Sequence, residues 1–280
     1  MLLPKFLQRI LAKRKQKRTF REYGYEVKRF SVEGIGAVEY AQWSHPAESA
    51  KSVTIDGVNF YRQFVHDGEM AIDIGAHTGD TTVPMALATG KSGLTVAFEP
   101  NKYVHKILAK NATLNPDKTR IDAYCLATTA EDGQFEFNYS DASFCNGGFL
   151  SQIKQHRKAT RGHAYKLNVT GVNLEKFLRE KYAAALPRLK LIKIDAEGYD
   201  KEIVKSIPNL LRDYRPHLLV ECYKRLTEAE RFDLYDTLVG GGGGYELFYL
   251  ENFKNGGVKV KINRDDMLKY SHFDIWAMPK

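Results

Sequence analysis

The sequence predicts a doubly wound α/β fold, in which helices cover both faces of a mostly parallel sheet. Short apolar runs at 70–74, 94–98, 121–125, 190–194 and 216–222 have the length and composition of buried strands. Segments with helical periodicity separate most of them, at the spacing of strand–helix–strand units. Two further runs, 245–250 and 273–278, are predicted to close the sheet as antiparallel strands.

Length and composition agree with a globular α/β protein. The chain has 280 residues, of which 43% are hydrophobic, enough for a large core. No apolar run approaches the roughly 18–20 residues that a membrane span needs. The cysteines, Cys125, Cys145 and Cys222, show neither metal-ligand spacing nor a disulfide framework. This pattern favours a reducing compartment, so a cytoplasmic location is expected.

Residues 1–22 form a basic arm that differs from the rest of the chain. Positions 1–21 hold eight Lys or Arg and no acid, which accounts for the whole formal net charge of +8. Apolar residues recur there at helical spacing, opposite the basic ones. Such a helix can lie on an anionic membrane surface, hold nucleic acid or a partner, or be a solvated terminus. We keep these alternatives open.

Residues 23–68 are predicted to be an N-terminal extension that packs on the core, and 69–280 to be the main domain. Strand-like patterns occur in the extension at 26–30, 53–55 and 59–64, with turns at 34–36 and 56–57. In the main domain, alternation predicts a strand at 134–138, and a polar, glycine-bearing, basic loop spans 140–161. Helices are predicted at 172–182 and at 227–239, the second with Thr227 and Glu230 as a capping box. The five glycines at 240–244 read as a linker.

The most informative segment is AIDIGAHTGD at 71–80, which reads as a strand end, a glycine turn and a helix start. A dinucleotide fingerprint would place glycines at 77 and 80, where the chain has His77 and Asp80. A phosphate-binding loop needs a lysine before its helix, and none occurs between Met70 and Gly90. Asp80 would repel a pyrophosphate at the helix N-terminus but not a cationic sulfonium. The pattern therefore favours S-adenosylmethionine.

The next strands end in acids. Glu99 follows Gly75 by 24 positions, where this topology places a carboxylate on the ribose hydroxyls. A carboxylate accepts from both hydroxyls at once. The runs at 191–198 (LIKIDAEG) and 216–222 (PHLLVEC) end in Asp195 with Glu197, and in Glu221. Because the carboxyl ends of parallel strands meet at one edge of a sheet, we expect these acids to share a site.

Three segments together resemble the motifs of FkbM-type methyltransferases, namely IDIGAHTGD at 72–80, FEPN at 98–101 and IKIDAEG at 192–198. The segment VTGVNLEKF at 169–177 and the strand end at 220–221 are also similar. The resemblance covers roughly residues 60–223. It implies a class I, Rossmann-like methyltransferase fold and S-adenosylmethionine as methyl donor. It also implies O-methylation of a hydroxyl group on a glycan, a lipid or a small natural product.

Candidate site residues follow from these motifs. Asp195 and Glu197 are the candidate bases or orienting groups, with Glu221 supporting them. The candidate cofactor-binding residues are Asp73, Gly75, Ala76, His77, Thr78, Gly79, Glu99, Pro100, Asn101, Ala127 and Asp195. The candidate acceptor-binding residues, from the polar loop, are Ser143, Asn146, Gly147 and Gly148. Clustered acids can hold Mg²⁺, but no metal site is predicted. His217 is expected to be structural, since it starts its strand at the far end.

Other functions remain open at this point. A ribose 2′-O-methyltransferase acting on RNA would share the motif core and use the basic arm to hold phosphates. A non-catalytic binding domain would keep the fold without the chemistry. An NAD-dependent enzyme is disfavoured by the glycine spacing.

Overall fold

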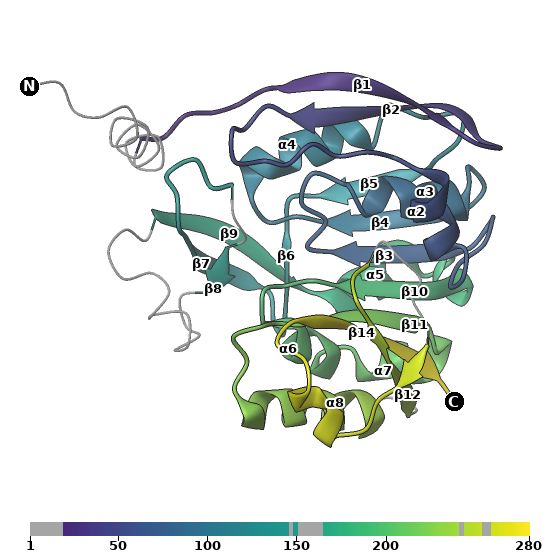
Figure 1. Cartoon of the computed structure of the whole chain (residues 1–280), viewed down its shortest axis with the longest axis vertical. Coiled ribbons are helices and arrows are strands. Elements are labelled where there is room, and N and C mark those ends of the chain that lie inside the picture. The colour runs from purple at the N-terminus through teal and green to yellow at the C-terminus, as the bar shows by residue number, and fades with distance from the viewer. Residues whose placement is uncertain (1–18, 146–147, 151–164, 241–243, 254–258) are drawn as a thin grey trace, which may run out of the picture.

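The computed structural model describes residues 19–145, 148–150, 165–240, 244–253 and 259–280, and the structural statements below concern these residues. Its centre is an eight-stranded sheet in the order β13-β12-β14-β11-β10-β3-β4-β5 (Figure 1). The strands are β3 (Met70–Ile74), β4 (Leu94–Phe98), β5 (Ile121–Tyr124), β10 (Leu189–Ile194), β11 (His217–Cys222), β12 (Tyr245–Leu250), β13 (Val260–Lys261) and β14 (Phe273–Pro279). All strand pairs from β11 to β5 are parallel, whereas β14, β12 and β13 are paired antiparallel. The predicted mostly parallel sheet with an antiparallel C-terminal end is confirmed.

Helices cover both faces of this sheet because its strands are apolar on both sides. Met70, Ile72 and Ile74 of β3 face the larger core cluster, which packs against the helices that follow in the second half of the chain. Ala71 of the same strand faces the opposite cluster, beneath the first helices. Figure 1 shows this division. The helices are α2 (Ile55–Tyr61), α3 (Thr82–Thr89) and α4 (Lys102–Asn111) on one side, and α5 (Leu174–Tyr182), α6 (Asp200–Lys205), α7 (Pro208–Tyr214) and α8 (Glu228–Gly240) on the other, with the short η2 (Leu186–Arg188) and η3 (Asp265–Leu268).

The order of strands in the sheet reverses direction at β3. The chain runs outward from β3 to β4 and β5, and later places β10 and β11 on the other side of β3. The carboxyl ends of β3 and β10 therefore stand side by side at the point of reversal. In open α/β sheets, ligands bind at this point.

A second sheet follows β5 and contains β6 (Ala127–Thr129), β9 (Tyr165–Asn173), β7 (Gly133–Tyr139) and β8 (Phe149–Leu150), in that order. The predicted strand at 134–138 is confirmed as β7. The helix predicted from residue 172 begins only at Leu174, because Val172 still belongs to β9. Asn173 ends that strand and caps α5 by accepting a hydrogen bond from the backbone N–H of Lys176.

The N-terminal extension begins with the hairpin β1 (Tyr25–Val32) and β2 (Gly36–Trp43), which turns at 34–36 as predicted. The strands predicted at 53–55 and 59–64, and the turn at 56–57, were wrong. Thr54 caps helix α2 by accepting from Gly57 N–H. Val58 and Tyr61 then bury one face of that helix, and this apolar face produces the alternation that resembles a strand.

Asparagines of α4 and of the turn after it fasten β2 to the main domain. The Asn111 side chain accepts from Ala41 N–H at 2.6 Å and donates to the carbonyl oxygens of Ala41 and Thr78. Asn115 exchanges two similar bonds with the backbone of Glu39. The hairpin therefore supports the loop after β3, which contains Thr78.

The predicted capping box of α8 is confirmed. Glu230 accepts from the backbone N–H of Thr227 at 2.8 Å, and the Thr227 hydroxyl accepts from Glu230 N–H at 3.4 Å. In the described parts of the chain, no helix combines the length and apolar character needed to cross a membrane. Residues 1–18 of the basic arm, most of the basic loop and glycines 241–243 lie outside the described residues, so the predictions for them stay predictions.

Candidate active site at the carboxyl edge of the central sheet

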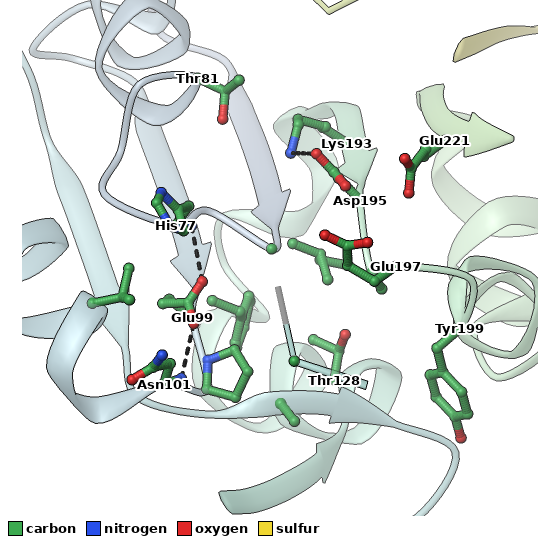
Figure 2. Close-up of a pocket in the computed structure, with 18 of the residues that line it drawn as sticks. His77, Thr81, Glu99, Asn101, Thr128, Lys193, Asp195, Glu197, Tyr199 and Glu221 are labelled. Atoms are coloured by element: carbon green, nitrogen blue, oxygen red, sulfur yellow. Dashed lines mark hydrogen bonds and ion pairs between the residues drawn. The ribbon is translucent and has the colours of Figure 1, made fainter. Parts of the chain in front are cut away.

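A cavity of about 470 Å³ opens where β3 and β10 end, within the range of small-molecule sites, roughly 300–1,000 Å³. Its walls come from the loops after β3, β4 and β10, from the second sheet and from the ends of β11 and β14. Figure 2 shows Glu99, His77 and Asn101 on one side, and Lys193, Asp195, Glu197 and Glu221 on the other.

Gly75 lies where the backbones after β3 and β10 come closest. Its φ is +72°, in the left-handed region. A Cβ atom built on Gly75 would lie only 1.9 Å from the backbone oxygen of Asp195. Asp195 N–H in turn donates to the Ile74 oxygen at 3.1 Å. Only glycine permits this approach, so Gly75 sets the distance between the two halves of the site.

Glu99 is held in one position by two backbone donors. Its Oε2 accepts from His77 N–H at 3.0 Å and its Oε1 accepts from Asn101 N–H at 2.8 Å (Figure 2). Burial raises the pKa of Glu99, although His77 and the two donors oppose this. Each carboxylate oxygen has a further lone pair, so the group still has acceptor capacity for a ligand in the cavity.

Beneath the cavity lies a buried ion pair between neighbouring strands. Lys193 Nζ is 3.1 Å from Asp73 Oδ1 and 3.5 Å from Asp195 Oδ2, and the Lys193 and Asp73 side chains are 1% and 0% exposed. Asp73 Oδ2 also accepts from the hydroxyls of Thr81 and Thr82. Burial alone would lower the pKa of Lys193, but Asp73 and Asp195 raise it, so the ammonium stays charged. Asp73 thus anchors the start of α3 to β10.

The loop after β10 presents Glu197 in an unusual backbone conformation. Glu197 has φ of +52° and Gly198 has φ of +94°. Asp200 stabilises the loop by accepting from the N–H groups of Ala196 and Gly198, at 3.0 and 2.9 Å. Non-glycine residues in the left-handed region are costly and are found preferentially at functional sites. Burial, with Asp195 adding to it, raises the pKa of Glu197 to about 7.

A third acidic group is provided by the antiparallel end of the sheet. Glu221 pairs in register with Asp274, and both line the cavity. His272 Nε2 is 2.9 Å from Glu221 Oε1, while Glu221 Oε2 is buried without a hydrogen-bond partner. Burial and the neighbouring acids raise the pKa of Glu221 well above its usual value and that of Asp274 to about 8.

Most of the residues predicted for the site lie on the cavity wall. They are Gly75, His77, Glu99, Pro100, Asn101, Ala127, Gly148, Asp195, Glu197 and Glu221. Asp195 and Glu197 do not cap α6, since its first residue, Asp200, holds the preceding loop itself. His217 is held by Trp276 at the opposite end of β11, which agrees with a structural role.

The structure places five of the predicted residues behind the wall rather than on it. Asp73 is engaged in the buried ion pair with Lys193. Ala76, Thr78 and Gly79 pack against α4 and β2. Thr78 is hydrogen-bonded to Tyr40 and Asn111. Ser143 is buried, and its hydroxyl accepts from Arg21 N–H. Asn146 and Gly147 lie outside the described residues. Asp80, expected in the first helical turn, precedes α3 and is paired with Lys51.

Sequence reasoning missed several cavity residues. Lys193 had a visible signal, a charge inside an otherwise apolar strand. No sequence signal marks Lys51, His272 or Asp274, because they lie in segments without a motif and reach the site through tertiary packing. Among the residues that the structure describes, no three His, Cys, Asp or Glu side chains are grouped as a metal ion would require.

Comparison with known proteins gives one family match and distant structural similarities. The model of the Methyltransferase FkbM domain matches residues 73–247. No curated protein matches the sequence. The chain is similar to methyltransferase FkbM from Methylobacillus flagellatus at 12% identity, with 80% of this chain and 51% of that chain covered and a TM-score of 0.45. It therefore spans about half the length of that protein.

Two further solved structures show comparable similarity. Precorrin-6y C5,15-methyltransferase from Geobacter metallireducens has 11% identity, 80% and 88% coverage of the two chains, and a TM-score of 0.42. TYW2 from P. horikoshii, in complex with MeSAdo, has 11% identity, 91% and 72% coverage, and a TM-score of 0.40.

Proposed function

Because this chain belongs to the FkbM methyltransferase family, we propose that it transfers the methyl group of S-adenosylmethionine to a hydroxyl group of a glycan, a lipid or a small natural product. The sheet order agrees with the predicted Rossmann-like fold, and the family match supports the predicted class of enzyme, an S-adenosylmethionine-dependent methyltransferase. The acceptor and the chemistry at oxygen are our proposal. The observation that carries it is Glu197, an acid in a left-handed conformation at the cavity, with a pKa near neutrality.

The charges on the cavity wall suit the proposed cofactor. Five acids face the cavity. Four of them lie at the ends of four strands, namely Glu99, Asp195, Glu221 and Asp274, and the fifth, Glu197, lies in the loop after β10. The ionised acids among them attract a sulfonium cation and repel a pyrophosphate, whereas the raised pKa values of Glu221 and Asp274 leave these two largely protonated at neutral pH, as hydrogen-bonding groups. Glu99 would accept hydrogen bonds from the ribose hydroxyls, and Ala127 and Thr128 would contact the adenine. When bound, S-adenosylmethionine supplies a methyl group already activated by the positive sulfur.

Glu197 is proposed to be the general base for the acceptor hydroxyl. An alcohol is a poor nucleophile until its proton is removed, and a base works best when its pKa lies near the operating pH. With a pKa of about 7, Glu197 is largely ionised above neutrality and still basic enough to take the proton. Burial is the main cause of this raised pKa, and the neighbouring Asp195 adds to it.

Glu221 and His272 are proposed to orient the acceptor. Oε2 of Glu221 is buried without a partner although Oε1 is bound to His272, so a hydroxyl of the acceptor would complete its hydrogen bonding. Orientation contributes strongly here, since the methyl donor is preactivated and the reaction depends on in-line geometry.

The acidic wall also favours neutral acceptors over anionic ones. Phosphate groups would be repelled by Asp195 and by ionised Glu197, while Glu221 and Asp274, with their raised pKa values, add little negative charge at neutral pH. This argues against RNA as the acceptor near the reacting atoms. It leaves neutral hydroxyl compounds as the acceptors that the charge of the cavity supports best.

Transfer of labelled methyl groups to a panel of neutral glycans, lipids, natural products and RNA tests the proposal. We expect label on a hydroxyl of a neutral acceptor, and a loss of turnover of about 10²- to 10⁴-fold in Glu197→Gln, since the base is removed. Glu180→Gln, at an exposed position on α5, is the matched control and should keep full turnover. Unchanged turnover in Glu197→Gln, or label only on RNA, would contradict the proposal.

A further inference from the structure

Lys51 and Asp80 form an ion pair on the wall of the same cavity. Lys51 Nζ is 3.0 Å from Asp80 Oδ2 and 3.2 Å from Glu48 Oε1, and the Lys51 and Asp80 side chains are only 17% and 14% exposed. Lys51 precedes α2 in the N-terminal extension, outside the residues that the family model matches. The chemistry proposed above leaves this pair without a role.

The pair lies on the part of the wall that the other arms of the cofactor do not use. The sulfur of S-adenosylmethionine carries three substituents, namely the adenosyl group, the methyl group and an amino-acid chain. Under the proposed function, Glu99 and Thr128 would contact the adenosyl group, and Glu197 and Glu221 would face the methyl group. The remaining wall is formed by the loop that leads into α3, and there Asp80 and Lys51 line the cavity.

The amino-acid chain ends in an ammonium and a carboxylate, so its subsite needs one cation and one anion side by side. Among the described residues that line the cavity, the lysines are Lys51 and Lys193. Lys193 is enclosed between Asp73 and Asp195 and is only 1% exposed, whereas Lys51 is 17% exposed and is therefore the more accessible of the two to a ligand. Lys51 makes two contacts with carboxylates, and an ammonium has three N–H groups.

The charge state of Lys51 is also suitable. Burial alone would lower its pKa, but Asp80 and Glu48 raise it above the usual value, so the ammonium is charged at neutral pH. Close by, the Phe253 ring lies 5.2 Å from Lys193 Nζ and lines the cavity together with Lys51. Because the Lys51 and Asp80 side chains are only 17% and 14% exposed, little water surrounds the pair, and a charge-assisted hydrogen bond is stronger there than in bulk solvent.

From these observations we propose that Lys51 binds the carboxylate of the amino-acid end of S-adenosylmethionine, and that Asp80 binds its ammonium group. This inference rests on the proposed function, because it requires S-adenosylmethionine as the ligand. It assigns a cofactor contact to the N-terminal extension, which the family motifs do not include.

Two adenosine thioethers test the inference without any turnover. S-adenosylhomocysteine keeps the amino-acid chain, whereas 5′-methylthioadenosine lacks it. Calorimetric titration of the full chain should give Lys51→Gln an S-adenosylhomocysteine Kd about 10- to 100-fold higher than wild type, and a 5′-methylthioadenosine Kd within about twofold of it. Asp80→Asn should behave in the same way. Lys106→Gln, which removes an exposed ion pair with Glu22, is the control and should change neither Kd.

The possible results separate the inference from the proposed function. Lys51→Arg, which keeps the charge, should recover most of the affinity for S-adenosylhomocysteine. Equal losses for both ligands in Lys51→Gln would show that the residue only supports the fold, and an unchanged S-adenosylhomocysteine Kd would show that it binds no carboxylate. Either result overturns the inference. Failure of the wild-type chain to bind either ligand would overturn the proposed function as well.

Discussion

At the scale of single residues, Glu197 and Asp195 illustrate how the backbone assigns different roles to neighbouring acids. Asp195 directly follows β10 and stays near Lys193. Glu197 has a left-handed backbone conformation. Burial, rather than a neighbouring cation, has the largest effect on its pKa and raises it. Two acids two positions apart thus have different surroundings, and the burial of Glu197 suits the role of a base.

This difference predicts a pH dependence of turnover. An acid with a pKa of about 7 is protonated below that pH and cannot accept a proton, so kcat/KM should fall about tenfold per pH unit below it. Above it, kcat/KM should reach a plateau. Initial rates between about pH 5 and 9 measure this profile. Glu197→Gln should lose the dependence along with the activity, whereas a wild-type profile that is flat across neutrality would exclude Glu197 as the base.

The sequence was informative for residues at the ends of parallel strands. Glu99, Asp195 and Glu221 could be predicted to meet because the topology alone brings such ends to one edge. His272 and Lys51 could not be predicted in this way. Their positions depend on how the antiparallel end of the sheet and the N-terminal extension pack around that edge.

At the scale of secondary-structure elements, the contact between β3 and β10 positions the site. Gly75 follows one strand and Asp195 the other, and their backbones are too close for any side chain at Gly75. The Asp73–Lys193 pair fixes the same two strands from beneath. Hydrogen bonds from Asn111 then tie the loop after β3 to the N-terminal hairpin. The loop after β3 is therefore supported on both sides.

Replacing Gly75 with alanine should disrupt this contact. The added Cβ would overlap the Asp195 oxygen and would occupy a left-handed backbone, so we expect a loss in unfolding free energy of about 3 kcal/mol or more. Urea unfolding followed by circular dichroism measures it. Gly24→Ala is the matched control, because nothing lies within 4 Å of its Cβ position, and it should change stability by less than about 0.5 kcal/mol. Equal stability of the two variants would contradict this role of Gly75.

Element boundaries show where sequence patterns were insufficient. Seven of the eight strands of the main sheet were predicted, because they are apolar runs of strand length that helices mostly separate. The two-residue, exposed β13 was not predicted. Helix α2 was mistaken for strands, since a seven-residue helix is too short to display its period. The β-branched segment that leads into α5 belongs to β9, and only the cap at Asn173 marks the change.

At the scale of the whole molecule, opposite charges occupy different regions. Eight Lys or Arg and no acid lie within residues 1–21, whereas the rest of the chain is balanced, with 34 basic and 34 acidic residues. Within that balanced part, acids gather at the carboxyl edge of the sheet, on the cavity wall. Net charge alone would suggest an anionic ligand, but the local field of the cavity favours a cationic one.

We propose that this cavity binds a sulfonium nucleoside rather than a dinucleotide. Calorimetric titration of the full chain with S-adenosylmethionine and with NAD tests it most directly. We expect saturable binding of S-adenosylmethionine at one site per chain and no measurable binding of NAD. Binding of NAD, or no binding of S-adenosylmethionine, would contradict it.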